Sequence, residues 1–335
     1  MPEQQGKTAP YDHVGVIGAG AWGTALALVA ARAGRNVTLW AREAEIVDSV
    51  HTARENRLYL PGVILPETIT ATGDLAVASK ADALLIVVPA QHLRGALSML
   101  TLAMETPLVL CAKGIERDTG KLVTEILNEC APRAEPAILS GPSFAKDVAR
   151  HLPTAVTIAA KPDIAARLQA TLGHLTFRPY ASDDLVGVAL GGAAKNVYAI
   201  ACGIVAGMGL GESARAALLA RSFAELCRLG EALGAKSETL MGLAGLGDLV
   251  LTATSPTSRN YAFGLAVGKA VPRAELFAPG RPLAEGVETA PALVARARRE
   301  HVELPIAEAV ADILSGKLAL DAALPRLMAR PLKME

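Results

Sequence analysis

The chain has 335 residues, and its 33 lysines and arginines are balanced by 33 aspartates and glutamates. A chain of this length usually forms two domains, or one large α/β domain with an appendage. Because the net charge is zero, there is no electrostatic field of the kind that attracts a polyanion, and a nucleic-acid partner is not expected.

The cysteines and the N-terminus favour a cytoplasmic protein. Residues 1–12 form a short tail without an apolar stretch of the length that a signal peptide needs. The four cysteines show no CxxC or other ligand spacing, which predicts reduced thiols and no metal site. They are Cys111, Cys130, Cys202 and Cys227.

The first half of the chain has the pattern of a parallel sheet. Short apolar runs alternate with helix-length segments from residue 13 to about residue 140, as in βαβ units. We therefore expect an α/β fold whose N-terminal domain, residues 13–185, is of the Rossmann type, with strands 154–159 and 175–180 at the far edge of its sheet. The other expected strands are 14–17, 36–40, 83–88, 108–111 and 137–139.

The sequence of the second half predicts helices. After Asp183 the apolar residues recur with helical spacing, so residues 186–330 are expected to form an all-helical domain. Glycine-rich residues 242–247 and the segment 255–260 are expected as loops that could face a ligand. The expected helices are 185–207, 214–233, 261–268, 289–300 and 306–315.

One segment, residues 186–211, is apolar enough to raise the question of a membrane span. Lys195 and Asn196 lie near its middle, its residues are mostly Ala and Gly rather than Leu and Ile, and no second span accompanies it. We therefore predict a buried core helix and no membrane span.

Residues 18–23, Gly18-Ala19-Gly20-Ala21-Trp22-Gly23, form the motif of a dinucleotide-binding turn. They follow an apolar strand and precede a helix expected over residues 24–33. In such a turn Gly18 forms the bend, Gly20 admits the pyrophosphate, and Gly23 lets the helix pack closely, with the helix N-terminus directed at the phosphates. A merely structural glycine turn is the weaker interpretation.

The end of the second expected strand predicts which dinucleotide binds. An acidic residue there would bond the ribose hydroxyls of NAD(H), but this chain has Arg42 followed by Glu43. The guanidinium favours NADP(H), with NAD(H) left open. The alternative is that Arg42 is a solvated surface charge.

The loops after the strands and the helical half together carry a family resemblance. The chain resembles the NAD(P)-dependent sn-glycerol-3-phosphate dehydrogenase family of the bacterial type from residue 13 to residue 315, in motif order and spacing. It departs at Ala21, where many relatives carry serine, and in the variable loop 89–92, so no role is assigned to His92. The motifs are Lys113-Gly114, 140–145, 191–196, 245–248, 258–260 and Glu285-Gly286.

The resemblance implies reversible hydride transfer between NAD(P)H and dihydroxyacetone phosphate, giving sn-glycerol 3-phosphate for glycerophospholipid synthesis. Lys195 is the expected acid/base group, because burial among small apolar residues lowers the pKa of an ammonium. The alternative, a lysine that snorkels to solvent, would need a polar face that this helix lacks.

The remaining site residues follow from the resemblance, supported by their chemistry. Asp248 could pair with Lys195, although it could also be a turn residue. The segment 258–260 combines a helix N-terminus, a hydroxyl, a guanidinium and an amide, which suits a phosphate, while Ser258 alone could be an N-cap. The expected substrate-binding residues are Lys113, Gly141, Ser143, Lys195, Asp248, Ser258, Arg259 and Asn260. The expected cofactor-binding residues are Gly18, Gly20, Ala21, Trp22, Gly23, Arg42, Lys113, Ala145, Arg259, Leu283 and Glu285.

Two other functions remain open from the sequence. A β-hydroxyacid dehydrogenase of the 6-phosphogluconate type would share the domains and a helix-borne lysine, but Lys113-Gly114 and residues 258–260 favour glycerol 3-phosphate. A non-catalytic NADPH-binding sensor would not need Lys195 in an apolar helix. The sequence does not decide the oligomeric state, and a homodimer is left open.

Overall fold

A computed structural model describes residues 9–102, 105–278, 280 and 284–329. The chain divides into two compact units. The first contains the residues up to Ala112 together with Val123–Val188, and the second contains Lys113–Leu122 together with the residues from Ala189 onward. The short segment Lys113–Leu122 thus leaves the first unit and belongs to the second.

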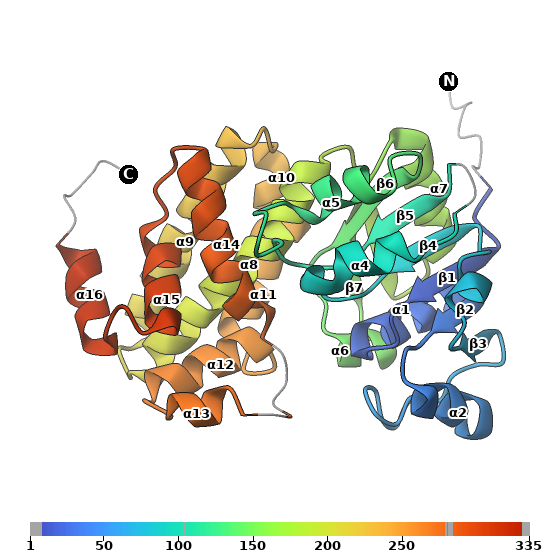
Figure 1. Cartoon of the computed structure of the whole chain (residues 1–335), viewed down its shortest axis with the longest axis horizontal. Coiled ribbons are helices and arrows are strands. Elements are labelled where there is room, and N and C mark those ends of the chain that lie inside the picture. Colours follow the sequence, from blue (N-terminus) through green and yellow to red (C-terminus); the bar gives the residue numbers. More distant parts are fainter. Residues whose placement is uncertain (1–8, 103–104, 279, 281–283, 330–335) are drawn as a thin grey trace. The chain divides into compact units, whose positions relative to one another are not determined.

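The first unit contains an eight-stranded sheet in the order β3-β2-β1-β4-β5-β6-β7-β8 (Figure 1). Every neighbouring pair is parallel except β6 and β7, which are antiparallel. This arrangement confirms the expected mostly parallel sheet. The strands are β1 (His13–Ile17), β2 (Asn36–Trp40), β3 (Ile69–Thr72), β4 (Ala83–Ile86), β5 (Pro107–Leu110), β6 (Glu135–Ser140), β7 (Thr154–Ala159) and β8 (Phe177–Ser182).

The two edges of the sheet differ in how well the sequence predicts them. The pair β7 and β8 lies at the far edge, as expected. Strand β3, at the opposite edge, was not among the predicted strands. Its sequence, Ile-Thr-Ala-Thr, has only four residues, and a buried isoleucine and a buried alanine that alternate with threonines give a weak apolar signal.

The helices of the first unit connect these strands. Helix α1 (Ala21–Arg32) follows the glycine turn and contains eight consecutive buried residues, Gly23 to Ala30. The others are α2 (Ala44–Ala53), α3 (Leu75–Ala78), α4 (Leu93–Ser98), α5 (Val123–Cys130), α6 (Ala145–Ala149) and α7 (Pro162–Leu172), with a 3₁₀ turn at Ala90–His92.

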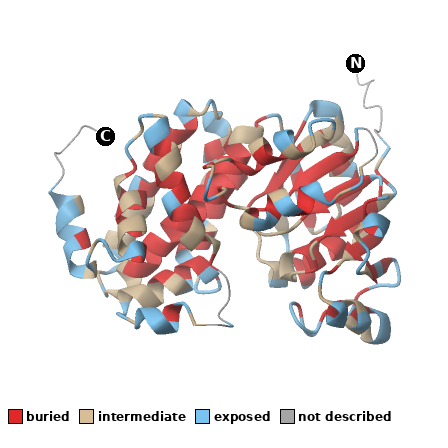
Figure 2. Ribbon diagram, in the orientation of Figure 1, coloured by how far each residue is buried: buried red, intermediate tan, exposed pale blue. Residues whose placement is uncertain are grey.

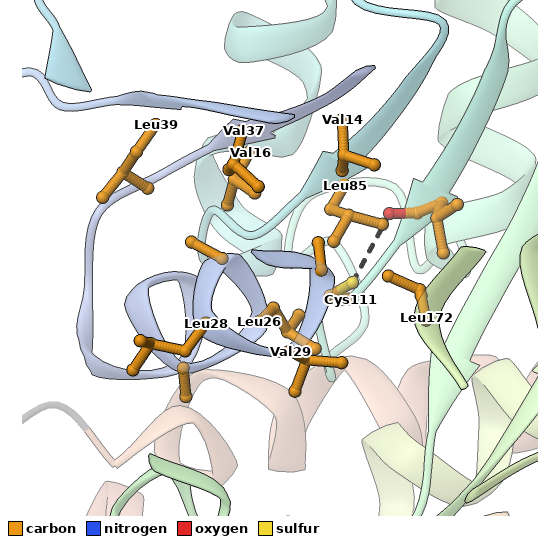
Figure 3. Close-up of a cluster of buried hydrophobic side chains, with 14 of the residues drawn as sticks. Val14, Val16, Leu26, Leu28, Val29, Val37, Leu39, Leu85, Cys111 and Leu172 are labelled. Atoms are coloured by element: carbon orange, nitrogen blue, oxygen red, sulfur yellow. Dashed lines mark hydrogen bonds between the residues drawn. The ribbon is translucent and has the colours of Figure 1, made fainter. Parts of the chain in front are cut away.

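The core of this unit lies where α1 packs on the sheet. Leu26 and Val29 of α1 are fully buried together with Val16 of β1 and Leu39 of β2 (Figure 3). Burying one such side chain stabilises the fold by roughly 1.5–3 kcal/mol. This buried core therefore fixes the position of α1, and of the glycine turn that precedes it, against the sheet.

In the part of the second unit that the structure describes, the regular elements are helices, apart from the segment 113–122. Its first helix, α8 (Leu185–Gly207), begins four residues before the division between the units and is the central buried helix of this region (Figures 1 and 2). The others are α9 (Glu212–Ala232), α10 (Ser237–Met241), α11 (Asp248–Thr254), α12 (Arg259–Gly268), α13 (Arg273–Leu276), α14 (Glu285–Arg299), α15 (Pro305–Ser315) and α16 (Leu320–Met328).

Helix α8 is long and apolar enough to cross a bilayer by length and composition. However, 94% of its most apolar 18-residue window is buried inside the fold. Burial to this extent is expected of a core helix, as predicted.

Close backbone packing fixes α8 against α12. A Cβ added at Gly264 would lie 2.1 Å from the carbonyl oxygen of Ile200, and one at Gly203 would lie 2.2 Å from that of Tyr261. No side chain fits at such distances, so glycine is required on both helices. The contact aligns the helix that carries Lys195 with the helix that begins at Arg259.

Candidate active site

Lys195 is buried in α8 and contacts two side chains of α11. Its exposed fraction is 6%. Its Nζ donates to Oδ1 of Asp248 at 2.5 Å and to Oγ1 of Thr252 at 3.0 Å. Both partners are buried as well, so the ammonium group is enclosed by an ion pair and a hydroxyl rather than by water.

These surroundings shift the pKa values of both Lys195 and Asp248. Burial lowers the pKa of Lys195 to about 7, the nearby Lys113 ammonium acts in the same direction, and the Asp248 carboxylate opposes them. Burial alone would raise the pKa of Asp248, but the two lysines together outweigh it and hold that pKa below its usual value. Asp248 therefore remains a carboxylate while Lys195 can gain and lose a proton near neutral pH.

The local backbone explains the position of Asp248. Residues Leu243–Gly247 form a π-helical turn, and Asp248 is the first residue of α11. The prediction of a loop over residues 242–247 is therefore wrong, because helical hydrogen bonding continues through the glycines. The turn packs closely on α8, where a Cβ at Gly191 would lie 2.6 Å from the Ala244 carbonyl oxygen. Thr252 follows Asp248 by one helical turn and shares its face.

Lys113 supplies a second ammonium to the same carboxylate. Its Nζ lies 2.6 Å from Oδ2 of Asp248, while Lys195 occupies Oδ1. The side chain of Lys113 is 15% exposed, more than that of Lys195 at 8%. Asp248 thus bridges two cations, one on α8 and one on the segment 113–122.

Two asparagines link the backbone of this site. Asn196 donates through Nδ2 to the carbonyl oxygen of Lys113 at 3.0 Å and accepts through Oδ1 from Nδ2 of Asn260 at 2.9 Å. Oδ1 of Asn260 accepts from the backbone N–H of Gly286 at 2.9 Å. These three hydrogen bonds connect Lys113 and α8 to the starts of α12 and α14, so the four parts of the site keep their positions relative to one another.

The N-terminal ends of α12 and α14 carry the remaining predicted residues of this unit. Ser258 is the N-cap of α12, and its hydroxyl accepts from the N–H of Tyr261, so the capping interpretation is correct. The cap uses only one N–H group of the first turn, and the others stay available for an anion. Arg259 is exposed, and Glu285 begins α14. Burial raises the pKa of Glu285, although the positive charge of Arg259 opposes the shift. Leu283 lies outside the described residues.

In the first unit, the glycine turn has the features of a dinucleotide site. Gly18 has a φ of +117°, which favours glycine, and a Cβ at Gly23 would lie 1.8 Å from the Gly18 carbonyl oxygen. A Cβ at Gly20 would meet nothing within 4 Å, and Gly20, as the N-cap of α1, has no side chain to cap the helix. Nε1 of Trp22 is buried and has no hydrogen-bond partner among the described residues. The uncapped N–H groups at the start of α1 fit the phosphates of a dinucleotide.

Other predicted residues of the first unit lie after its strands. Arg42 follows β2, is largely exposed and pairs with Glu43 at 3.0 Å, a surface contact that costs little to break. Gly141 and Ser143 follow β6, where Oγ of Ser143 donates to the Gly141 carbonyl oxygen at 3.0 Å, and Ala145 begins α6. Their roles in binding stay predictions.

Thr252 and Asn196 are the site residues that sequence reasoning missed. A hydroxyl at position i+4 from Asp248 signals a shared helix face, but only once residues 248–254 are recognised as a helix. Asn196 directly follows Lys195 in an apolar helix, and a polar side chain in such a helix needs partners. That signal is present in the sequence itself.

Comparisons with known proteins place these residues in a family. Residues 13–166 match the description "NAD-dependent glycerol-3-phosphate dehydrogenase N-terminus", and residues 184–325 match the corresponding C-terminus. Together the two regions cover most of the chain. They include the glycine turn as well as Lys195, Asp248 and Glu285.

Whole-length relatives agree with these matches. The chain is 61% identical to glycerol-3-phosphate dehydrogenase [NAD(P)+] of Bradyrhizobium sp. (strain ORS 278), over 97% of this chain and 98% of the relative. It is 56% identical to the enzyme of the same name from Parvibaculum lavamentivorans, over 98% and 99%. The solved structure of glycerol-3-phosphate dehydrogenase from Coxiella burnetii has a TM-score of 0.91 and 38% identity, covering 96% of this chain and 99% of that one. The chain therefore belongs to the NAD-dependent glycerol-3-phosphate dehydrogenase family.

Proposed function

We propose that Lys195 is the acid/base group of an NAD(P)-dependent reduction of dihydroxyacetone phosphate to sn-glycerol 3-phosphate. The reaction, in both directions, is that of the family. The observation that carries the assignment is the buried position of Lys195, with a pKa of about 7 and contacts to Asp248 and Thr252. Family membership decides against a β-hydroxyacid dehydrogenase and against a non-catalytic sensor.

The side chains around Lys195 account for the proton that the reaction consumes. The nicotinamide, when bound, supplies the hydride to the carbonyl carbon. The Lys195 ammonium donates its proton to the carbonyl oxygen, and in the reverse direction the neutral amine takes the proton of the substrate hydroxyl. Asp248 stabilises the ammonium form, so the lysine is protonated in a buried place without losing its ability to donate near pH 7.

The second ammonium has a distinct role in this proposal. Lys113 is more exposed than Lys195 and is held by the same carboxylate. A cation beside the substrate oxygen stabilises the negative charge that develops there during proton transfer. We therefore assign Lys113 to polarisation of the carbonyl and Lys195 to proton transfer.

Substrate phosphate and cofactor are assigned to the helix N-termini. Ser258, Arg259 and Asn260 at the start of α12 would hold the substrate phosphate, with Gly141 and Ser143 as further substrate contacts. The residues proposed to hold the dinucleotide are Gly18, Gly20, Ala21, Trp22, Gly23, Arg42, Lys113, Ala145, Arg259, Leu283 and Glu285. A spectrophotometric assay of dihydroxyacetone phosphate reduction, with NADPH and NADH in parallel, tests the function. If neither NADPH nor NADH is oxidised, the proposed function is refuted.

The cellular role follows from the product. sn-Glycerol 3-phosphate is the backbone of glycerophospholipids, and we propose that a cytoplasmic enzyme supplies it for their synthesis. The homodimer stays a prediction, which the molar mass in solution would test.

Arg42→Glu should weaken NADPH binding far more than NADH binding, because a carboxylate would then face the 2′-phosphate. The wild-type Arg42 pairs with its neighbour Glu43 at the surface, so a phosphate can replace that contact at little cost. The measurement is kcat/KM for both cofactors in the wild type and the variant. Unchanged discrimination would show that Arg42 does not contact the ribose phosphate.

Arg259→Ala should raise the KM for dihydroxyacetone phosphate at least tenfold, since a charge-assisted contact to phosphate contributes roughly 1.5–3 kcal/mol. Arg326→Ala is the matched control, because Arg326 is also exposed in the helical unit but pairs with Asp312 on the surface. The control should leave the KM unchanged. A smaller effect at Arg259 would make it a peripheral contact.

A further inference from the structure

Asn56 is a buried asparagine that hydrogen-bonds to the glycine turn from a distant part of the chain. It lies in the loop after α2 and has no exposed surface. Its Nδ2 donates to the carbonyl oxygen of Ala19 at 2.7 Å and to Oγ1 of Thr24 at 2.8 Å. Its Oδ1 accepts from the backbone N–H of Tyr59 at 3.1 Å, which fixes the orientation of the amide.

The bond to Ala19 determines where the neighbouring N–H points. The carbonyl of Ala19 and the N–H of Gly20 belong to one planar trans peptide, so they point in opposite directions. Because Asn56 binds the carbonyl on the buried side, the Gly20 N–H points to the other side. The space beside the Gly20 Cα is open as well, since a Cβ there would meet nothing within 4 Å.

The loop that carries Asn56 is itself fixed. The guanidinium of Arg54 donates to the carbonyl oxygens of Leu65 at 3.2 Å and Ile69 at 2.8 Å, which ties the loop to the start of β3. The N–H of Leu60 donates to the carbonyl oxygen of Asn56 at 2.9 Å. The Ala19 carbonyl oxygen has a second side-chain partner besides Asn56, since the hydroxyl of Thr24 lies 3.4 Å from it.

We infer that Asn56 is a positioning residue for the cofactor. It holds the peptide between Ala19 and Gly20 in the orientation that directs the Gly20 N–H and the uncapped start of α1 at the dinucleotide phosphates. Asn56 has no part in the proton transfer at Lys195. The inference rests on the proposed function only in that residues 18–23 hold the dinucleotide.

The test compares the apo stability and the cofactor affinity of Asn56→Leu, which keeps the volume of the side chain and removes its donors and its acceptor. The Kd for NADPH, followed by fluorescence without turnover, should rise about tenfold or more. The KM for dihydroxyacetone phosphate at saturating NADPH should stay within about twofold of the wild type, because substrate contacts are untouched.

Thr171→Val is the matched control for a buried polar group in the same unit. Thr171 is also fully buried, and its hydroxyl accepts from the N–H of Tyr11 at 2.9 Å. The control should lower the melting temperature and leave the Kd for NADPH unchanged. If Asn56→Leu also lowers only the melting temperature, Asn56 is merely structural and the inference is wrong.

A second variant covers the case in which Asn56→Leu does not fold. Thr24→Val removes the hydroxyl that accepts from Asn56 and that itself lies 3.4 Å from the Ala19 carbonyl oxygen. The peptide between Ala19 and Gly20 then loses part of its support, so the Kd for NADPH should rise about threefold. A wild-type Kd in a folded Thr24→Val protein would then refute the inference. If the wild type itself binds neither NADPH nor NADH, the cofactor assignment fails rather than the role of Asn56.

Discussion

Lys195→Met should lower kcat by at least about 100-fold while folding and NADPH binding survive. General acid–base catalysis contributes roughly 10²- to 10⁴-fold, and methionine keeps the length and apolar character of the stem without a proton to transfer. Lys195 is enclosed by Asp248 and Thr252 in the helical unit. Single-turnover reduction of dihydroxyacetone phosphate measures the loss directly, and fluorescence gives the affinity for NADPH.

Lys269→Met is the control for loss of a lysine charge from the same unit. Lys269 is exposed at the end of α12, so kcat should stay at the wild-type value. If Lys195→Met binds the cofactor normally and keeps more than about a tenth of kcat, the assignment of Lys195 is wrong. Asp248 or Lys113 would then be the candidate for the role.

The pH profile of the wild type should have opposite slopes in the two directions. Reduction needs the ammonium form of Lys195, so its rate should fall as the pH rises through about 7. Oxidation needs the neutral amine, so its rate should rise over the same range. Both limbs should disappear in Lys195→Met.

The elements whose sequences are mostly apolar, or that follow a strand–turn–helix pattern, were predictable from the sequence. The run of apolar and small residues over 185–207, interrupted by Lys195 and Asn196, predicts the core helix α8 with its observed bounds, and the strand, turn and helix of residues 13–33 predict the start of the Rossmann unit. Such local patterns determine secondary structure wherever one face or the whole element is buried. The burial of Lys195 was predictable for the same reason, since α8 offers a lone lysine no polar face along which to reach solvent.

The parts that escaped prediction depend on contacts between distant residues. The π-helical turn at Leu243–Gly247 forms against α8, and its glycines signal a loop when they are read alone. The segment 113–122 leaves the sheet and joins the helical unit, although it follows a buried strand directly. Lys113 and Asp248 are 135 residues apart, and they can pair only because the segment 113–122 belongs to the helical unit. No local sequence pattern predicts this pairing.

Asp248→Asn should lower the rate of reduction at pH 8 by about 10- to 1,000-fold. The carboxylate raises the pKa of Lys195 against burial and against Lys113. Loss of an opposite charge at this distance shifts a pKa by roughly 1–3 units, and above the pKa each unit removes tenfold of the ammonium form. The descending limb of the reduction profile should therefore move from about 7 to lower pH.

Glu225→Gln is the matched control for loss of a buried carboxylate from the helical unit. Glu225 is 2% exposed, and its Oε1 accepts from the N–H of Ile306 at 2.7 Å, at the start of α15 and not at a lysine. Its replacement should change the melting temperature and leave the midpoint of the pH profile in place. If Asp248→Asn lowers the rate by an equal factor at every pH and leaves the midpoint near 7, Asp248 does not set the pKa of Lys195. Its contribution would then be limited to holding the two ammonium groups in place, and proton transfer at Lys195 would not depend on the charge of Asp248.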